Sequence, residues 1–316
     1  MNVFKVSYAL EEGTGTRNGN DSRRSASGMT TKGATMTARA IAMSMVGWIC
    51  SMLSSSMTPA VVTSGLTRRF GEFTAVEDVN LSVAPGQFFG FLGPNGAGKS
   101  TTIKMLTGLL APTSGTIQIL GMDPTASPLE VKRQIGVVPE GLALFGRLTG
   151  GEYLKFVGQM YGLDKALTAQ RTTELLEFMS LASEPKKLIT DYSHGMQKKL
   201  ALAAAVIHGP KILFLDEPFE GVDAIASGTL KTMLQGMIAR GATIFLTSHV
   251  LEIVERLCTH IAIIDHGRLI THGSLDELRA GVATPSGERA TLEEIFIQVV
   301  GSLHAAETPR ELTWLG

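Results

Sequence analysis

The sequence predicts an α/β fold in which a mostly parallel sheet is covered by helices and a helical subdomain is inserted. From Ala60 onward, short apolar runs typical of buried strands alternate with longer segments of helical period. From about Leu142 to Leu188 the helical pattern continues with no strand candidate, which indicates the inserted subdomain. The 316 residues are 44% hydrophobic and 18% charged, a balance that excludes wholesale disorder and allows a sizeable core.

Short apolar runs bounded by turn residues are the expected strands: Phe88–Leu92, Thr116–Leu120, Ile135–Val138, Ile212–Leu215, Thr243–Leu246 and Ile261–Ile264. Longer segments with apolar residues at helical spacing are the expected helices: Ser100–Leu109, Glu152–Tyr161, Ala169–Met179, Gly195–Ile207, Ala226–Ile238 and Val250–Leu257. A further apolar pattern at Leu292–Ile297 predicts a packing helix near the C-terminus.

Residues 1–57 are predicted to form a disordered leader. They are rich in Ser, Thr, Gly and Met, and no strand or helix period persists over the first 35 residues. A membrane-surface amphipathic anchor is the alternative interpretation. The apolar stretch Ala40–Leu53 resembles a weak signal-peptide core, but its 14 residues are too few to cross a bilayer, which needs about 20. No later segment reaches that length without charge, so the chain is not expected to form a channel by itself.

Charge and cysteine content narrow the possible partners and compartment. The net charge is −1, with 28 basic and 29 acidic residues, so nucleic acid is not an expected partner. The two cysteines, Cys50 and Cys258, cannot form a disulfide framework, which fits a reducing compartment.

The strongest motif is a glycine-rich run that fits the pattern G-x-x-x-x-G-K-S/T: Gly93-Pro94-Asn95-Gly96-Ala97-Gly98-Lys99-Ser100-Thr101. It follows a strand pattern and precedes a helical one, as a phosphate-binding loop requires. Glycines let several backbone N–H groups point at phosphate oxygens, and the next helix presents its positive dipole end. Lys99 would supply a charge for the β and γ phosphates, and the Ser100 hydroxyl would reach Mg²⁺. A glycine-rich turn with no ligand is the alternative.

A second motif is the apolar strand pattern that ends in Asp216 and Glu217. Ligands of open α/β sheets lie beyond the carboxyl ends of the strands. Asp216 would therefore lie beside the phosphate loop and hold Mg²⁺, and Glu217 would act on the attacking water as its general base or orienting group. By itself, a strand that ends in two acids does not indicate a functional site. Its occurrence together with the phosphate loop does.

A third motif, Tyr192-Ser193-His194-Gly195-Met196-Gln197, opens a helix before the acidic strand and resembles the L-S-G-G-Q signature of ATP-binding cassette (ABC) ATPases. The order of motifs is also similar, with His249 after the next strand pattern. The resemblance covers roughly Pro59 to Val300 and is strongest to ATP-binding subunits of drug, antibiotic and lipid exporters. It implies a P-loop NTPase core with a mostly parallel sheet, an antiparallel β subdomain and a helical subdomain at about 142–190. The ABC ATPase domain would span 58–300, with a C-terminal tail at 301–316.

The resemblance also implies a mechanism. Two cassettes, most simply a homodimer, would enclose each ATP between the phosphate loop of one copy and the signature of the other. Ser193 and Gly195 would contact the γ-phosphate across the interface, and the loop containing Asp223 would join the two sites. His249 would hydrogen-bond both the γ-phosphate and Glu217. Phe70 would stack on adenine, with Phe73 as the competing candidate.

The sequence departs from the family pattern at two positions. Glu140 stands where the family usually has Gln; a carboxylate can still bind Mg²⁺, but it adds negative charge near the triphosphate. A solvated loop residue is the alternative interpretation of Glu140. His194 replaces the first signature glycine, so its ring must fit near the opposing nucleotide or point away.

Partners follow from the resemblance as well. The cassette would energise a membrane-spanning permease subunit at the cytoplasmic face of the cell membrane, as a peripheral subunit. The docking surface would include Leu142, Leu144, Phe145 and Leu148, for which core packing is the alternative. A soluble ABC ATPase that acts on ribosomes or DNA is the alternative hypothesis. Ribosome-acting members usually have two cassettes and DNA-acting members a long coiled coil, whereas this chain has one phosphate loop and no sustained heptads between Lys99 and Ser193. A P-loop kinase or GTPase would need neither the signature nor this motif order.

Overall fold

The computed structural model describes residues 58–281 and 289–304, with side chains described as far as Gly301. The expected disordered leader at 1–57 lies outside the described residues, as does the expected tail beyond 304. Within the described ranges, no helix combines the length and the apolar character needed to cross a membrane.

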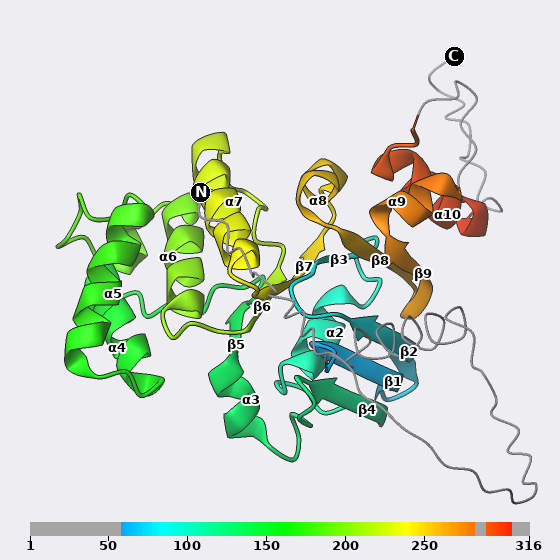
Figure 1. Ribbon diagram of the computed structural model, residues 1–316, viewed down its shortest axis with the longest axis horizontal. Helices are drawn as coiled ribbons and strands as arrows, with labels where there is room; N and C mark the ends of the chain where they lie inside the picture. Colours follow the sequence, from blue (N-terminus) through cyan, green and yellow to red (C-terminus); the bar gives the residue numbers. More distant parts are fainter. Residues whose placement is uncertain (1–57, 282–288, 305–316) are drawn as a thin grey trace, which may run out of the picture. The chain divides into compact units, whose positions relative to one another are not determined.

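The larger sheet has six strands in the order β5-β6-β7-β3-β8-β9 (Figure 1). Its members are β3 (Phe88–Leu92), β5 (Ile135–Val138), β6 (Ile212–Asp216), β7 (Thr243–Ser248), β8 (His260–Asp265) and β9 (Arg268–Ser274). The strands from β5 to β8 run parallel, and β9 pairs antiparallel with β8. Every residue of β3, β6 and β7 is buried, as expected for strands covered on both faces. The predicted α/β fold with a mostly parallel sheet is confirmed.

A separate three-stranded antiparallel sheet has the order β2-β1-β4. It consists of β1 (Val61–Phe70), β2 (Phe73–Val83) and β4 (Ser114–Ile119). The run expected at Thr116–Leu120 is therefore a strand of this sheet, and it pairs with β1 rather than with the parallel strands. The sequence analysis gave no range for β1 and β2, although buried Val79, Leu81 and Val83 alternate with exposed residues in β2.

The described helices are α2 (Lys99–Leu106), α3 (Pro128–Gln134), α4 (Gly150–Met160), α5 (Lys165–Phe178), α6 (His194–Val206), α7 (Ala224–Ala239), α8 (Leu251–Leu257), α9 (Leu275–Ala280) and α10 (Leu292–His304). Sequence periodicity gave no expectation for α3 and α9, which have seven and six residues. The domain boundary expected at residue 300 falls inside α10.

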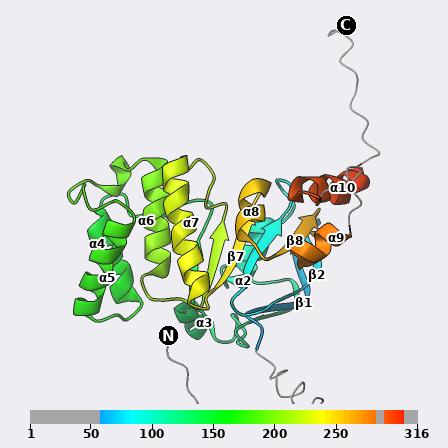
Figure 2. The ribbon, with the colours of Figure 1, turned by 45° about the horizontal axis from the view of Figure 1, so that its top comes forward.

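The segment between β5 and β6 is helical, as predicted. Figures 1 and 2 both show α4 and α5 side by side and next to α6. α4 begins with a capping box in which Thr149 and Glu152 satisfy each other's backbone N–H groups. α5 begins at the N-cap Asp164, whose carboxylate accepts from Leu167 N at 2.9 Å.

The strand register brings three loop-bearing strand ends to one edge of the sheet. Leu92 at the end of β3 lies opposite Ser248 at the end of β7, and Asp216 at the end of β6 lies opposite Thr247. Side chains that directly follow these strands therefore lie close together, although the end of β3 is more than 100 positions from the ends of β6 and β7 in the sequence.

Candidate functional site

The phosphate-loop motif forms a tight bend between β3 and α2. Gly98, the N-cap of α2, has φ +103°, and a Cβ there would lie 2.6 Å from the Ala75 carbonyl oxygen. At Gly93 a Cβ would lie 2.2 Å from the Ile264 carbonyl oxygen. Any larger residue at these two positions would displace the backbone, so the glycines are required by packing as well as by conformation.

Lys99 is folded back over this bend. Its side chain is buried, and its ammonium donates to the carbonyl oxygens of Gly93 at 2.8 Å and Pro94 at 3.1 Å. The lysine thus stabilises the loop, and it places a positive charge at the centre of the bend.

The acidic end of β6 is held by Thr247 on the neighbouring strand. The Thr247 hydroxyl donates to Asp216 Oδ1 at 2.6 Å, and the Glu217 N–H donates to the Thr247 hydroxyl and carbonyl oxygens at 3.2 Å each. Both acids are at least nine-tenths buried. Buried carboxylates are costly unless they are hydrogen-bonded or paired with charge, so their positions are tightly constrained.

The Glu217 carboxylate lies between two cationic or polar partners. Its Oε2 is 3.0 Å from His249 Nδ1 and 3.3 Å from the His249 N–H, while its Oε1 is 3.9 Å from Lys99 Nζ. Among the described residues no donor hydrogen-bonds Oε1, although the atom is buried. One carboxylate oxygen is therefore anchored, and the other is presented beside the phosphate loop.

These groups line a cleft of about 420 Å³. Its lining residues are Phe73, Ala75, Asn95, Gly96, Gly98, Lys99, Ser100, Thr101, Glu140, Glu217, Glu220 and His249. The structure thus brings together most of the predicted phosphate-loop, acidic and histidine residues. Gly93, Pro94, Ala97 and Asp216 belong to the surrounding shell and do not line the cleft. Sequence reasoning missed Ala75 and Glu220, for which no motif gives a signal.

The aromatic residue at the cleft is Phe73, not Phe70. Phe73 is 65% exposed and lines the cleft, whereas Phe70 lies outside it with the Arg68 guanidinium 4.5 Å from its ring centroid. The two residues pair with each other across the turn between β1 and β2. Their side chains nevertheless have different surroundings. The geometry favours the stated competitor, Phe73, and which ring stacks on adenine stays a prediction.

Two side chains with oxygen ligands suited to a hard cation, Ser100 and Glu140, line the cleft, and a third candidate, Asp216, lies outside its lining. The Ser100 hydroxyl lies 3.5 Å from Glu140 Oε2, and both residues line the cleft. Asp216 lies one residue before Glu217 and uses one oxygen to accept from Thr247. Hydroxyl and carboxylate oxygens are the ligands that Mg²⁺ prefers, so the donor set fits the expected ion. Glu140 is exposed in the loop after β5 and lies close to Ser100, so its role toward a metal ion stays a prediction.

The remaining predicted residues lie away from the cleft. Ser193 and Asp223 are the N-caps of α6 and α7, accepting from Met196 N at 3.3 Å and Ala226 N at 2.8 Å. A Cβ on Gly195 would lie 3.5 Å from Asp223 Oδ2, so the two helix ends are adjacent. None of Ser193, Gly195 and Asp223 lines the cleft of its own chain. They form a second group, called here the α6–α7 end.

His194 also belongs to the α6–α7 end. A Cβ on Gly221 would lie 3.0 Å from His194 Cδ2, so the ring packs against this glycine of the chain's own loop before α7. His194 is nevertheless exposed. Whether the ring lies near an opposing nucleotide or points away from it stays a prediction.

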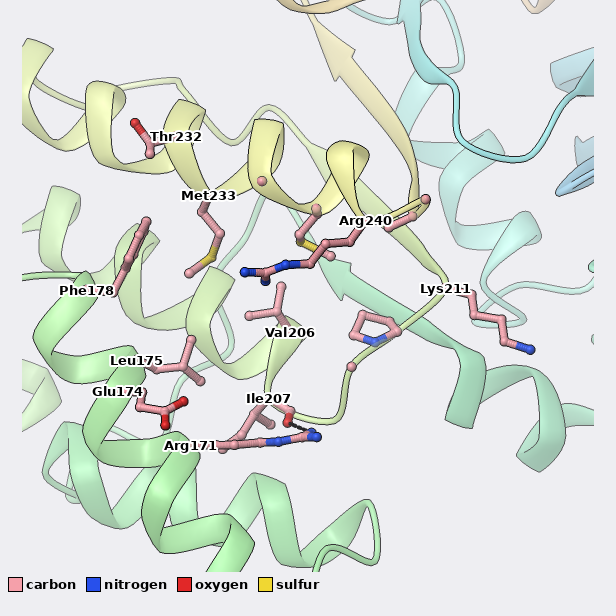
Figure 3. A pocket seen from close by; sticks show the side chains of 16 residues that line it. Arg171, Glu174, Leu175, Phe178, Val206, Ile207, Lys211, Thr232, Met233 and Arg240 are labelled. Carbon is pink, nitrogen blue, oxygen red and sulfur yellow. Dashed lines mark hydrogen bonds between the residues drawn. The ribbon is translucent and has the colours of Figure 1, made fainter. Parts of the chain in front are cut away.

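A larger cavity of about 670 Å³ opens elsewhere, between α5, the end of α6 and α7 (Figure 3). α5 contributes Arg171, Leu175 and Phe178, and α7 contributes Met233 from the other side. Arg171 donates to the Ile207 carbonyl oxygen at 2.6 Å. This cavity contains none of the predicted site residues, so size alone does not locate the functional site.

A parallel sheet with a phosphate loop after β3 and two consecutive acids, Asp216 and Glu217, at the end of β6 defines a P-loop NTPase. The ABC transporter family model matches residues 76–220. The daunorubicin/doxorubicin resistance ATP-binding protein DrrA of Streptomyces peucetius is 37% identical over 270 residues, which are 83% of this chain and 82% of that protein. The probable multidrug ABC transporter ATP-binding protein YbhF of Escherichia coli is 37% identical over 235 residues, 74% of this chain but 40% of that protein.

A solved structure described as the ATP-binding subunit of an ABC transporter has a TM-score of 0.71 and 32% identity, and it covers 76% of this chain and 99% of its own. The chain therefore belongs to the ABC transporter family. The family resemblance and the fold predicted from the motifs are confirmed.

Proposed function

We propose that this chain is the ATP-hydrolysing subunit that energises a membrane exporter. The observation that carries the proposal is the Glu217 carboxylate: His249 anchors one oxygen, and the other lies 3.9 Å from Lys99 and accepts no hydrogen bond from the described residues. A carboxylate held beside a phosphate loop can orient a water molecule for attack on the γ-phosphate and accept its proton.

Binding and hydrolysis would divide among the residues of the cleft. The backbone N–H groups of residues 95–101 and the Lys99 ammonium would hold the triphosphate of ATP, which the lysine reaches by leaving the loop carbonyls. Phe73 would stack on the adenine. His249 would orient Glu217 and donate to the γ-phosphate. Because little covalent chemistry is required of the protein, catalysis depends on positioning and charge stabilisation.

Mg²⁺ would be held by Ser100, Asp216 and Glu140. When bound, the ion would supply positive charge that offsets the negative charge of the triphosphate. The Thr247 hydroxyl, which donates to Asp216 Oδ1, leaves the other oxygen of that carboxylate to face the ion or its water.

A second copy would complete the site. At the α6–α7 end, Ser193 and Asp223 are exposed outside the cleft, where they would reach the ATP of a facing copy in a homodimer; Gly195 is buried beside them and would contribute its backbone N–H. The Ser193 hydroxyl accepts from Met196 N, so its own proton remains available to a phosphate oxygen.

The permease partner would dock beside the loop that follows Glu140. A small apolar pocket of about 190 Å³ lies there, lined in part by Leu142, Leu144 and Tyr153. Phe145 is 52% exposed beside it and packs edge-on against Tyr153. Leu142, Leu144 and Leu148 are all partly buried against the core, so Phe145 is the exposed member of the predicted docking surface. The names of DrrA and YbhF, a drug-resistance and a probable multidrug transporter protein, support an exporter at the cytoplasmic face of the membrane. No observation favours a ribosome or DNA partner.

The activity is tested by measuring ATP binding and phosphate release with the full chain and Mg²⁺. Wild type is expected to bind and hydrolyse ATP, and Lys99→Ala is expected to bind ATP about 100-fold more weakly, because it removes a charged donor. Lys231→Ala is the matched control. A wild-type protein that binds no ATP would contradict the proposal.

The partner is tested in membranes of cells that make the full chain. A peripheral subunit is expected to sediment with membranes, to be released by high salt and to co-purify in mild detergent with a protein that has several membrane spans. Phe145→Asp should abolish the association and leave ATP binding unchanged. Equal sedimentation of both proteins would contradict the docking surface.

A further inference from the structure

Glu217 has a backbone conformation that its surroundings must enforce. Its φ is +48°, in the left-handed region that residues with a Cβ avoid. Such a conformation persists only where contacts on both sides hold it, and it determines the direction in which the side chain leaves the backbone. The direction matters here because the carboxylate must lie between His249 and Lys99.

The N–H and the carbonyl of Glu217 are held by different elements. On the N–H side, both oxygens of Thr247 accept at 3.2 Å. On the carbonyl side, the Lys198 ammonium donates at 2.8 Å, and the Glu220 N–H donates at 3.3 Å from within the same turn. Lys198 is thus the side chain that fixes the peptide after Glu217, and it reaches there from α6.

Lys198 is held in a costly position. It is 2% exposed, and burial lowers the pKa of its ammonium, while the carboxylates of Glu220, Glu217, Asp216 and Glu140 act against that shift. A buried ammonium is retained where its charge and hydrogen bond are needed. The next residue, Lys199, is also buried but forms no hydrogen bond or ion pair within the described part of the chain. The two neighbouring lysines therefore differ in contact rather than in burial.

We propose that Lys198 is a positioning residue for ATP hydrolysis: its hydrogen bond to the Glu217 carbonyl oxygen holds the backbone conformation that aims the Glu217 carboxylate. The inference rests on the hydrolytic function proposed above. Loss of the bond lets the peptide after Glu217 rotate, and a carboxylate displaced by about 1 Å loses much of its catalytic effect. ATP binding is unaffected, because Lys198 does not line the cleft.

The first experiment needs no hydrolysis. Hydrogen exchange is measured on the nucleotide-free full chain for Lys198→Met, which keeps the length of the side chain and removes the donor, and for the control Lys199→Met. Exchange at residues 217–222 is expected to be about fivefold faster in Lys198→Met and unchanged in Lys199→Met, with α4 and α5 unchanged in both. Unchanged exchange at 217–222, or faster exchange throughout the sheet, would overturn the proposal.

The second experiment separates kcat from KM. Lys198→Met is expected to lower kcat about tenfold or more, with KM and the ATP dissociation constant within about twofold of wild type. Lys198→Arg, which keeps a charged donor, should recover part of kcat. In a Glu217→Gln background, Lys198→Met should cause no further loss of the residual rate. Loss of ATP affinity together with kcat, or an additional loss in the Glu217→Gln background, would show a general structural role and overturn the proposal.

The two experiments also distinguish the inference from the function on which it rests. A wild-type chain that does not hydrolyse ATP would contradict the proposed function, and the exchange comparison would still decide whether Lys198 holds Glu217. A hydrolysing wild type with an equally active Lys198→Met would contradict the inference alone.

Discussion

The cleft and the α6–α7 end are proposed to contact nucleotide, yet they are built in opposite ways. In the cleft, the charged groups Lys99 and Glu217 are buried and held by backbone and side-chain partners. At the α6–α7 end, Ser193 and Asp223 are exposed and act as helix caps. One copy therefore assembles the half of the site that requires desolvated charge, and it leaves the other half open to a second surface.

The difference has a physical cause. Buried charges must be positioned during folding, since an unpaired buried charge would destabilise the chain. Helix-capping groups are stable in water and retain further hydrogen-bonding capacity, so they can remain exposed until a second copy binds. The following predictions test whether the two halves act on the same nucleotide.

The largest effect is expected from the cleft. Glu217→Gln should lower kcat by about 100- to 10,000-fold, because it removes the proton acceptor, while ATP binding is retained. The Glu217→Gln protein should also form an ATP-stabilised dimer, measured by size-exclusion chromatography with light scattering. Glu252→Gln, an exposed acid paired with Arg256, is the control and should hydrolyse normally. Wild-type turnover by Glu217→Gln would contradict the role assigned to this carboxylate.

An intermediate effect is expected from the α6–α7 end. Ser193→Ala should lower turnover about 10- to 100-fold through loss of a hydrogen bond to a charged phosphate, with unchanged ATP affinity of the single chain. Thr149→Ala removes a comparable cap at α4, so it should cost a similar ~1 kcal/mol of stability without this loss of turnover.

A mixture of two variants tests whether the two halves of one site come from different copies of the chain. A Lys99→Ala chain and a Ser193→Ala chain each lack one half of the site, but a head-to-tail pair of them contains one complete site. The mixture is expected to hydrolyse ATP faster than either variant alone. A mixture no more active than the average of its components would show that both halves act within one chain.

The smallest effect is expected at the rim of the cleft. Phe73→Ala should weaken ATP binding about two- to tenfold through loss of stacking, while Phe70→Ala should leave the dissociation constant unchanged. Fluorescent ATP titration measures both. A loss for Phe70→Ala with none for Phe73→Ala would restore the assignment made from the sequence.

Motif reasoning placed the cleft well because each motif is contiguous. The loop from Gly93 to Thr101 carries its own strand, bend and helix start, so its chemistry can be read locally. Phe73 was harder to choose, because Phe70 and Phe73 flank one turn and only the register of β1 and β2 decides which ring faces the cleft. Lys198 gave no signal at all: in the sequence it is one of two adjacent lysines, and its contact with Glu217 spans 19 positions.

The sequence by itself determined the parallel sheet, the inserted helices, the phosphate loop and the acidic strand end, because local apolar patterns and short motifs encode them. Tertiary structure decided which aromatic ring reaches the cleft and that Ser193 and Asp223 lie outside it. It also decided that the buried Lys198 donates a hydrogen bond to the Glu217 carbonyl oxygen. These features depend on strand register and on packing between distant segments, and no local pattern records either.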